Sequence, residues 1–136
     1  MRILFFLIFI CSELFYCQEN ATKIIIKSID FSINTVVDVD CYEFDHPEFK
    51  DCKTITIYDH YTIDKICKYL KEFKIDTLSR YLPDTRAKIY LEYNMKNDDI
   101  ICLSNVAMSY NCRPILFNKK FLILIKDIIK KNHRNY

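Results

Sequence analysis

The sequence predicts an α+β fold: a curved antiparallel sheet of about five to six strands with two helices on one face. Alternating apolar and polar residues mark the strand segments, and apolar residues at intervals of three and four mark two helices. The order of elements is one or more strands, a helix, four strands and a final helix. No internal repeat or linker divides them, so we expect a single α+β domain over residues 18–136.

The first half of this domain predicts the strands that precede the first helix. Residues 23–30 are rich in isoleucine and predict a strand, and residues 36–41 predict a second, weaker one. Residues 42–52 form an acidic, aromatic loop, which Pro47 interrupts. Residues 53–58 alternate between polar and apolar side chains and predict a further strand.

A helix follows, and Asp59 or Thr62 can cap its first turn, because a short side-chain oxygen accepts a free backbone N–H there. Its apolar face consists of Ile63, Ile66, Cys67, Leu70 and Phe73. We expect Cys67 to be a free thiol within this face, where it acts as a small hydrophobic residue rather than a nucleophile.

The second half predicts four strands and a helix. Residues 86–93 alternate clearly, as in a sheet with one covered and one solvated face, and return through residues 100–104 after a turn containing Asn97-Asp98. A second hairpin is expected from residues 106–110 and 114–117, turning at residues 111–113. Asn118 can cap the last helix, which runs from residue 119 to about 131.

This order of elements resembles that of the repeat in the TATA-box-binding-protein-like fold. The resemblance concerns element order alone and implies no binding of nucleic acid. The formal net charge of +2 does not indicate a nucleic-acid partner either, because such proteins usually carry a strongly basic domain or face.

Residues 1–17 resemble a secretory signal peptide. Arg2 gives a positively charged start, residues 3–11 are an unbroken apolar run, and a polar stretch opens at Gln18. The run has about half the length of a membrane-spanning helix. We therefore expect a secreted or periplasmic protein.

Lipid anchoring to the cell envelope is the less favoured alternative. A lipoprotein signal would be cut before Cys11 or Cys17, and such cleavage requires a small preceding residue. Ile10 and Tyr16 occupy those positions, and both are bulky.

The chain contains no glycine, which excludes several common enzyme sites. A phosphate-binding loop, a dinucleotide fingerprint and a Gly-x-Ser-x-Gly elbow all depend on glycine. Any turn that requires a positive φ is expected to use Asn or Asp instead. We therefore expect a protein without enzymatic activity and without a cofactor.

Five cysteines lie beyond residue 17, so at most two disulfides can form after export. Local pairing would join Cys41 to Cys52 and Cys102 to Cys112. Crossed pairings among these four remain open.

Asp45, His46, Asp59 and His60 are weak candidates for metal ligands. Their spacing matches neither a zinc motif nor a calcium-binding loop. With nearby acids, these residues underlie the alternative interpretation, a small exported metal-binding protein or hydrolase.

Charge is distributed unevenly along the chain. The acidic surface comprises Asp38, Asp40, Glu43, Asp45, Glu48 and Asp51, and the basic helix carries Lys119, Lys120, Lys126, Lys130 and Lys131. The two groups could face one another, within one molecule or between copies. A basic amphipathic helix can also lie on an anionic membrane, but we expect its apolar face to pack on the sheet.

Four stretches carry a further resemblance: Lys-Thr-Ile-Thr-Ile at 53–57, Ile63-x-x-Ile66-x-x-Tyr69-Leu70-Lys71, Arg-Ala-Lys-Ile-Tyr-Leu at 86–91 and Ile-Cys-Leu at 101–103. They resemble small exported proteins of AT-rich Bacteroidetes-type bacteria over about residues 50–130, with secreted poxvirus-like proteins as the competing comparison. That bacterial group has no assigned activity, so the resemblance implies no site residue.

The leading interpretation is an exported, non-enzymatic binding module, such as an inhibitor, an immunity-type protein or a host-factor binder. Its small size, the absence of glycine-dependent sites and the polarised charge favour this interpretation. A protein is the expected partner.

Overall fold

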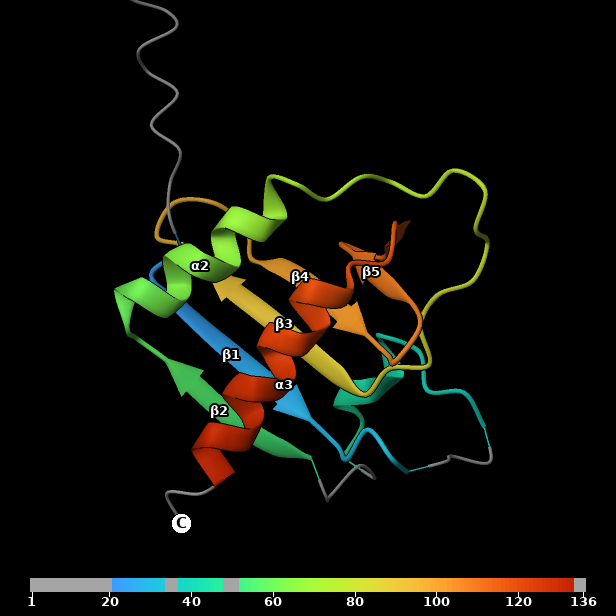
Figure 1. The fold of residues 1–136 in the computed structure, drawn as a ribbon, viewed down its shortest axis with the longest axis horizontal. Coiled ribbons are helices and arrows are strands. Elements are labelled where there is room, and N and C mark those ends of the chain that lie inside the picture. Colours follow the sequence, from blue (N-terminus) through green and yellow to red (C-terminus); the bar gives the residue numbers. More distant parts are fainter. Residues whose placement is uncertain (1–20, 34–36, 48–51, 134–136) are drawn as a thin grey trace, which may run out of the picture.

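A six-stranded antiparallel sheet with two helices on one of its faces forms the body of the protein (Figure 1). The computed structural model describes residues 21–33, 37–47 and 52–133. The strands are β1 (Lys23–Ser28), β2 (Lys53–Ile57), β3 (Ala87–Glu92), β4 (Asp99–Leu103), β5 (Met108–Tyr110) and β6 (Arg113–Ile115). The helices are α2 (His60–Leu70) and α3 (Lys119–His133), with a short 3₁₀ turn η1 (Glu43–Asp45). The predicted α+β class and element order are confirmed.

The strands lie in the order β2-β1-β3-β4-β5-β6, so β1 is flanked by β2 and β3. The register places Ile24 of β1 opposite both Ile57 and Leu91. Two residues further along β1, Ile26 lies opposite Ile55 and Ile89. Residues that are paired in register point to the same face of a sheet. These isoleucines and leucines therefore form one continuous apolar face.

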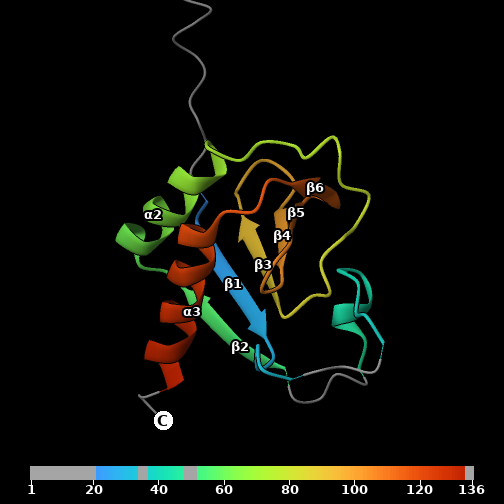
Figure 2. The same ribbon diagram turned by 45° about the vertical axis from the view of Figure 1, so that its right-hand side comes forward.

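Both helices cover this apolar face, as two views of the molecule show (Figures 1 and 2). Ile63 and Ile66 of α2, and Phe121 and Ile125 of α3, are fully buried against it. The Phe121 ring also contacts the ring of Phe73, just beyond α2, at a centroid distance of 5.2 Å. The core thus lies between the sheet and the two helices.

Each helix begins where the sequence predicts a cap. The side chain of Asp59 accepts a hydrogen bond from the backbone N–H of Thr62 at 2.9 Å, which makes Asp59 the cap of α2. The side chain of Asn118 accepts from the backbone N–H of Phe121 at 3.0 Å. Neither helix combines the length and the apolar composition that crossing a bilayer requires.

The opposite face of the sheet is partly covered by residues 37–47, which we call the back loop (Figure 2). Val39 and Phe44 of this loop are buried, and a disulfide joins Cys41 to Cys102 of β4 with a Cα–Cα distance of 5.8 Å. The backbone N–H of Thr85 also donates to the carbonyl of Val39 at 2.7 Å. The expected solvated face is therefore covered at its centre.

The local disulfide pairings are wrong, and the bond is one of the crossed alternatives. Cys102 points to the face that the back loop covers, because it lies between Ile101 and Leu103, which face the core. Cys52 and Cys112 are both free thiols. Cys52 lies just before β2, and Cys112 occupies the exposed turn between β5 and β6. Cys67 is free as well and half-buried.

Two further expectations need correction. Residues 37–41 form no strand, because they belong to the back loop, whose backbone bonds to the segment before β3. Within the part of the chain that the structure describes, the positive φ angles belong to Asn111 (48°) and Cys112 (62°), not to Asn97 or Asp98. A two-residue hairpin turn of type I′ has left-handed backbone at both positions, and a cysteine takes the second one here. Residues 1–17, the expected signal peptide, lie outside the described residues.

Removing the disulfide should lower stability substantially. The bond closes a sequence separation of 61 residues, so the Cys41→Ala/Cys102→Ala variant is expected to lose about 2–4 kcal/mol of unfolding free energy in urea titrations. Cys112→Asn is the control, because asparagine tolerates the left-handed backbone at that exposed position. A double variant as stable as the control would contradict the assignment.

Candidate functional site

The polar centre of the back face is the carboxylate of Asp45, at the end of η1. It accepts hydrogen bonds from Lys27 of β1 at 2.8 Å and from Lys88 of β3 at 2.5 Å. The hydroxyl of Tyr90, also on β3, donates to the same carboxylate. Asp45 therefore joins the back loop to two neighbouring strands.

These contacts set the protonation of Asp45. Partial burial acts to raise its pKa, but the hydrogen bonds from Lys27, Lys88 and Tyr90 outweigh burial and lower the pKa to about 2. The same contact acts in reverse on Tyr90, whose pKa rises because of burial and because its hydroxyl donates to the carboxylate. Asp45 is thus ionised throughout the physiological pH range.

The burial of the Lys88 ammonium explains why this polar cluster is needed. Its side chain is only 7% exposed, and its ammonium also donates to the backbone carbonyl of Cys41 at 2.7 Å. A buried cation is tolerated when it is paired and hydrogen-bonded. The oxygens of Asp45 thereby serve as partners for lysine and tyrosine.

The four candidate metal ligands are not brought together. Asp45 and His46 belong to the back loop, whereas Asp59 and His60 lie at the start of α2, on the other side of the sheet (Figures 1 and 2). Asp59 is engaged in capping the helix. A search of residues 21–33, 37–47 and 52–133 finds no group of three or more His, Cys, Asp or Glu side chains that could hold a metal ion.

The acidic surface is only partly a solvated cluster. Asp38, Asp40 and Glu43 are exposed, and Asp40 accepts from the backbone N–H groups of Tyr42 and Glu43, which fixes the start of η1. Asp45 is neutralised by the sheet lysines. Glu48 and Asp51 lie outside the described residues.

The basic helix does not face the described residues of the acidic surface within the molecule. α3 and the back loop lie on opposite sides of the sheet (Figure 2). Four of its lysines are exposed: Lys119, Lys120, Lys130 and Lys131. Lys126 is half-buried, because it reaches across to Asn105 of the β4–β5 turn, where its ammonium donates to the side-chain oxygen at 2.7 Å.

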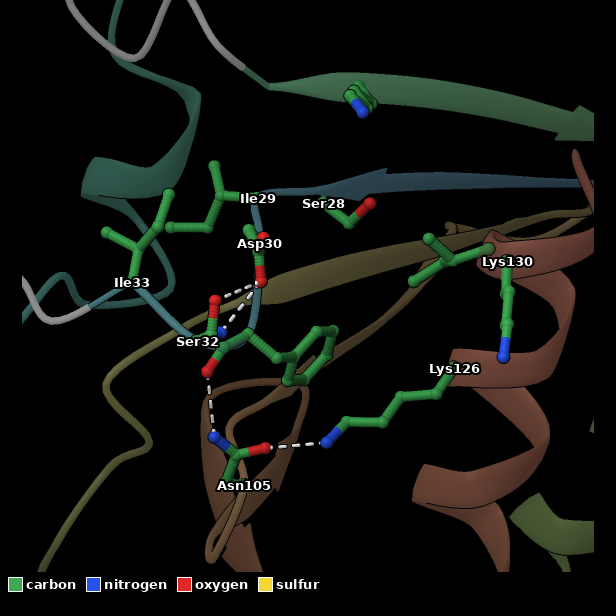
Figure 3. Close-up of a pocket in the computed structure, with 11 residues that line it drawn as sticks. Ser28, Ile29, Asp30, Ser32, Ile33, Asn105, Lys126 and Lys130 are labelled. Atoms are coloured by element: carbon green, nitrogen blue, oxygen red, sulfur yellow. Dashed lines mark hydrogen bonds between the residues drawn. The ribbon is translucent and has the colours of Figure 1, made fainter. Parts of the chain in front are cut away.

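Lys126 borders a cavity of about 900 Å³ between residues 28–33 and α3 (Figure 3). Phe31 and Ile129 contribute apolar surface, and three lysines with one aspartate contribute charge: Lys53, Lys126, Lys130 and Asp30. This cavity was not predicted from the sequence. The signal available for it was the i, i+3, i+4 spacing of Lys126, Ile129 and Lys130, which places all three on one side of a helix.

A second feature that was not predicted from the sequence is the exposure of apolar side chains on the connector between α2 and β3, residues 71–86. Its central part carries four exposed apolar side chains, which we call the connector rim: Ile75, Leu78, Tyr81 and Leu82. Leu78 is 92% and Tyr81 83% exposed, values unusual for large apolar side chains grouped within so few residues.

A buried carboxylate, Asp99, was predicted only as part of a turn. It accepts from the hydroxyl of Tyr93 at 2.7 Å, from Lys96 at 2.9 Å and from the side-chain amide of Asn111 at 2.9 Å. Burial acts to raise its pKa, but these hydrogen bonds lower it. Tyr93 follows β3, Lys96 lies in the β3–β4 turn and Asn111 follows β5, so Asp99, at the start of β4, ties one end of the sheet together.

Comparisons of the chain with protein-family models, with curated proteins and with solved structures find no match. The roles of the residues above therefore rest on geometry and chemistry.

Replacing Asp45 should destabilise the protein through Lys88. In urea titrations at pH 7, Asp45→Asn is expected to lose about 2–3 kcal/mol, because the buried Lys88 ammonium loses its anionic partner and keeps only neutral acceptors, such as the carbonyl of Cys41. Asp45→Asn/Lys88→Met should recover part of this loss, since it removes the unpaired cation. Asp38→Asn, an exposed position on the same loop, is the control. A double variant less stable than Asp45→Asn would show that Lys88 does not depend on Asp45.

The low pKa of Asp45 also predicts a dependence of stability on pH. Because the pKa is about 2 in the folded state, against 3.8 ordinarily, the ionised carboxylate stabilises the fold fully above about pH 4. This contribution is lost as the pH falls toward 2. After allowance for solvent screening of a side chain that is 35% exposed, it amounts to about 1–2 kcal/mol. Thermal melting between pH 6 and 2 should therefore fall more steeply for the wild type than for Asp45→Asn.

Proposed function

We propose that this protein is an exported, non-enzymatic binding module that contacts a protein partner through the connector rim. The observation that carries the proposal is the exposure of Leu78 and Tyr81 on a connector that is fixed at both ends. Contiguous exposed apolar side chains are typical of interaction sites, and tyrosine is common among the residues that dominate binding energy.

The connector is anchored where it leaves α2. Ile75 forms an isolated β-bridge with Ile115 of β6, and the backbone N–H of Asp76 donates to the carbonyl of Pro114 at 3.0 Å. The Asp76 carboxylate then accepts from the backbone N–H groups of Leu78 and Ser79, each at 3.0 Å. Leu78 therefore projects from an ordered turn, which reduces the entropy lost on binding.

The other end is held by Asp84 and Arg86. The carboxylate of Asp84 accepts from the guanidinium of Arg86 at 2.6 Å and from the backbone N–H of Val39 at 2.9 Å. Arg86 in turn donates its backbone N–H to the carbonyl of Leu103. A loop held in this way by a rigid scaffold is a common position for binding residues.

The two carboxylates that join segments of the sheet support binding rather than catalysis. Asp45 and Asp99 are each surrounded by protein donors that join separate strands, which is the arrangement of a structural polar cluster. The disulfide agrees with export, since such bonds persist in oxidising compartments.

The proposal predicts that a photo-crosslinking residue at position 78 captures one protein in the material surrounding the producing cell. The same residue at position 95 is the control, because Met95 is equally exposed but lies in the β3–β4 turn. Leu78→Asp/Tyr81→Asp should weaken binding of the captured protein by about 30-fold, the effect of losing a dominant contact, and Met95→Asp should not. Equal capture at both positions, or equal affinity of the two variants, would refute the proposal.

A further comparison separates this function from a metal-dependent one. His46→Ala/His60→Ala should leave the affinity for the captured partner within about twofold of the wild type, because neither histidine belongs to the connector rim. The melting temperature should also be unchanged by added Ca²⁺ or Zn²⁺. A metal-dependent rise in melting temperature that the double variant loses would favour the metal-binding alternative instead.

A further inference from the structure

The cavity between residues 28–33 and α3 combines an apolar lining with an excess of positive charge (Figure 3). Its volume of about 900 Å³ lies within the range of small-molecule pockets in proteins. Phe31 and Ile129 of α3 both line it, and so does the buried Ser28 at the end of β1. The space is thus large enough for an elongated apolar molecule.

The ammonium of Lys126 is held in a fixed position at this cavity. It lies 4.6 Å from the centre of the Phe31 ring and donates to the side-chain oxygen of Asn105 at 2.7 Å. The amide nitrogen of Asn105 in turn donates to the carbonyl of Phe31 at 3.0 Å. Figure 3 shows the contact of Lys126 with Asn105, which joins α3 to the β4–β5 turn. The position of the charge is therefore built from three separate segments.

This positive charge has no internal counter-ion. Lys126 uses one of its three donors on a neutral amide, and within the described residues neither Lys126 nor Lys130 forms an ion pair with a carboxylate. Lys130 lies one helical turn beyond Lys126 and also lines the cavity.

Among the described residues, Asp30 is the acidic one that lines the cavity, and its charge is already engaged. Its carboxylate accepts from the backbone N–H and the hydroxyl of Ser32, at 2.8 and 2.7 Å. With Lys53, which is paired with Ser28 at the start of β2, the described residues of the lining comprise three cations and one anion. An anionic group attached to an apolar body complements both features.

We propose that this cavity binds a free fatty acid, with its acyl chain between Phe31 and Ile129 and its carboxylate at Lys126 and Lys130. The carboxylate accepts hydrogen bonds from the two ammonium groups. Such bonds are charge-assisted and therefore stronger than bonds between neutral groups. The site shares no residue with the connector rim, so the proposal does not depend on the proposed protein partner.

The first test uses the wild-type, disulfide-bonded protein and laurate as the probe. Isothermal titration below the micelle concentration should give saturable one-to-one binding of laurate. Dodecanol, which has the same chain without the charge, should bind at least about tenfold more weakly, and acetate, which has the charge without the chain, should not bind. Equal affinity for laurate and dodecanol would overturn the role of the lysines, and binding of acetate would overturn that of the apolar lining.

The second test uses matched variants of α3. Lys126→Gln/Lys130→Gln should weaken laurate binding about tenfold, whereas Lys119→Gln/Lys120→Gln removes the same charge from the same helix away from the cavity and should have no effect. Ile33→Asp, at an exposed position in the lining, should weaken binding without affecting the fold. Equal losses in the two lysine variants, or binding only to vesicles of anionic lipid and not to laurate, would overturn the proposal.

Discussion

Burial of the Lys88 ammonium is the constraint on which the back face of the protein depends. β3 lies within the sheet, between β1 and β4, so a charge at this position can reach water only if the back face stays open. Once the back loop covers it, the ammonium needs an anion and a carbonyl, and Asp45 and Cys41 of that loop supply both. The loop buries few apolar residues of its own, chiefly Val39 and Phe44. Its position is therefore specified by polar contacts and by the disulfide, rather than by a second hydrophobic core.

Local sequence patterns predicted the helix-covered side of the sheet well because that side is governed by periodicity. Ile24 and Ile26 are two residues apart, as on one face of a strand, Ile63 and Ile66 are one turn apart, and both helices begin at residues suited to capping. The back face could not be predicted in this way, because its contacts join residues far apart in the chain. Lys88 looks solvent-facing in its own strand, and nothing near Cys41 indicates a partner 61 residues away. A cysteine at the back-facing position of β4 was the available clue that something covers that face.

The sheet also separates the two charged regions of the molecule. The exposed acids of the back loop lie on one side, and the lysines of α3 lie on the other (Figure 2). Charge complementarity between them can act only between copies or toward other molecules. Lys126 differs from its neighbours on α3, because its ammonium is turned toward Phe31 and Asn105 and is fixed there. A count of lysines along the helix cannot distinguish an ammonium that is held by protein contacts, as in Lys126, from one that is solvated.

The turn between β5 and β6 has a consequence for mutational tolerance. Glycine is usually the most favourable residue at a left-handed position, and Asn111 occupies one with a φ of 48°. Here, however, the Asn111 side chain accepts from the backbone N–H of Ile100 and donates to the buried Asp99. Glycine at position 111 would relax the backbone, but the Ile100 N–H and the Asp99 carboxylate would each lose a hydrogen-bond partner. The substitution that local backbone geometry prefers is therefore opposed by the tertiary structure. The lack of glycine at this turn is therefore part of how the chain holds its sheet together, and sequence statistics for isolated turns would misjudge it.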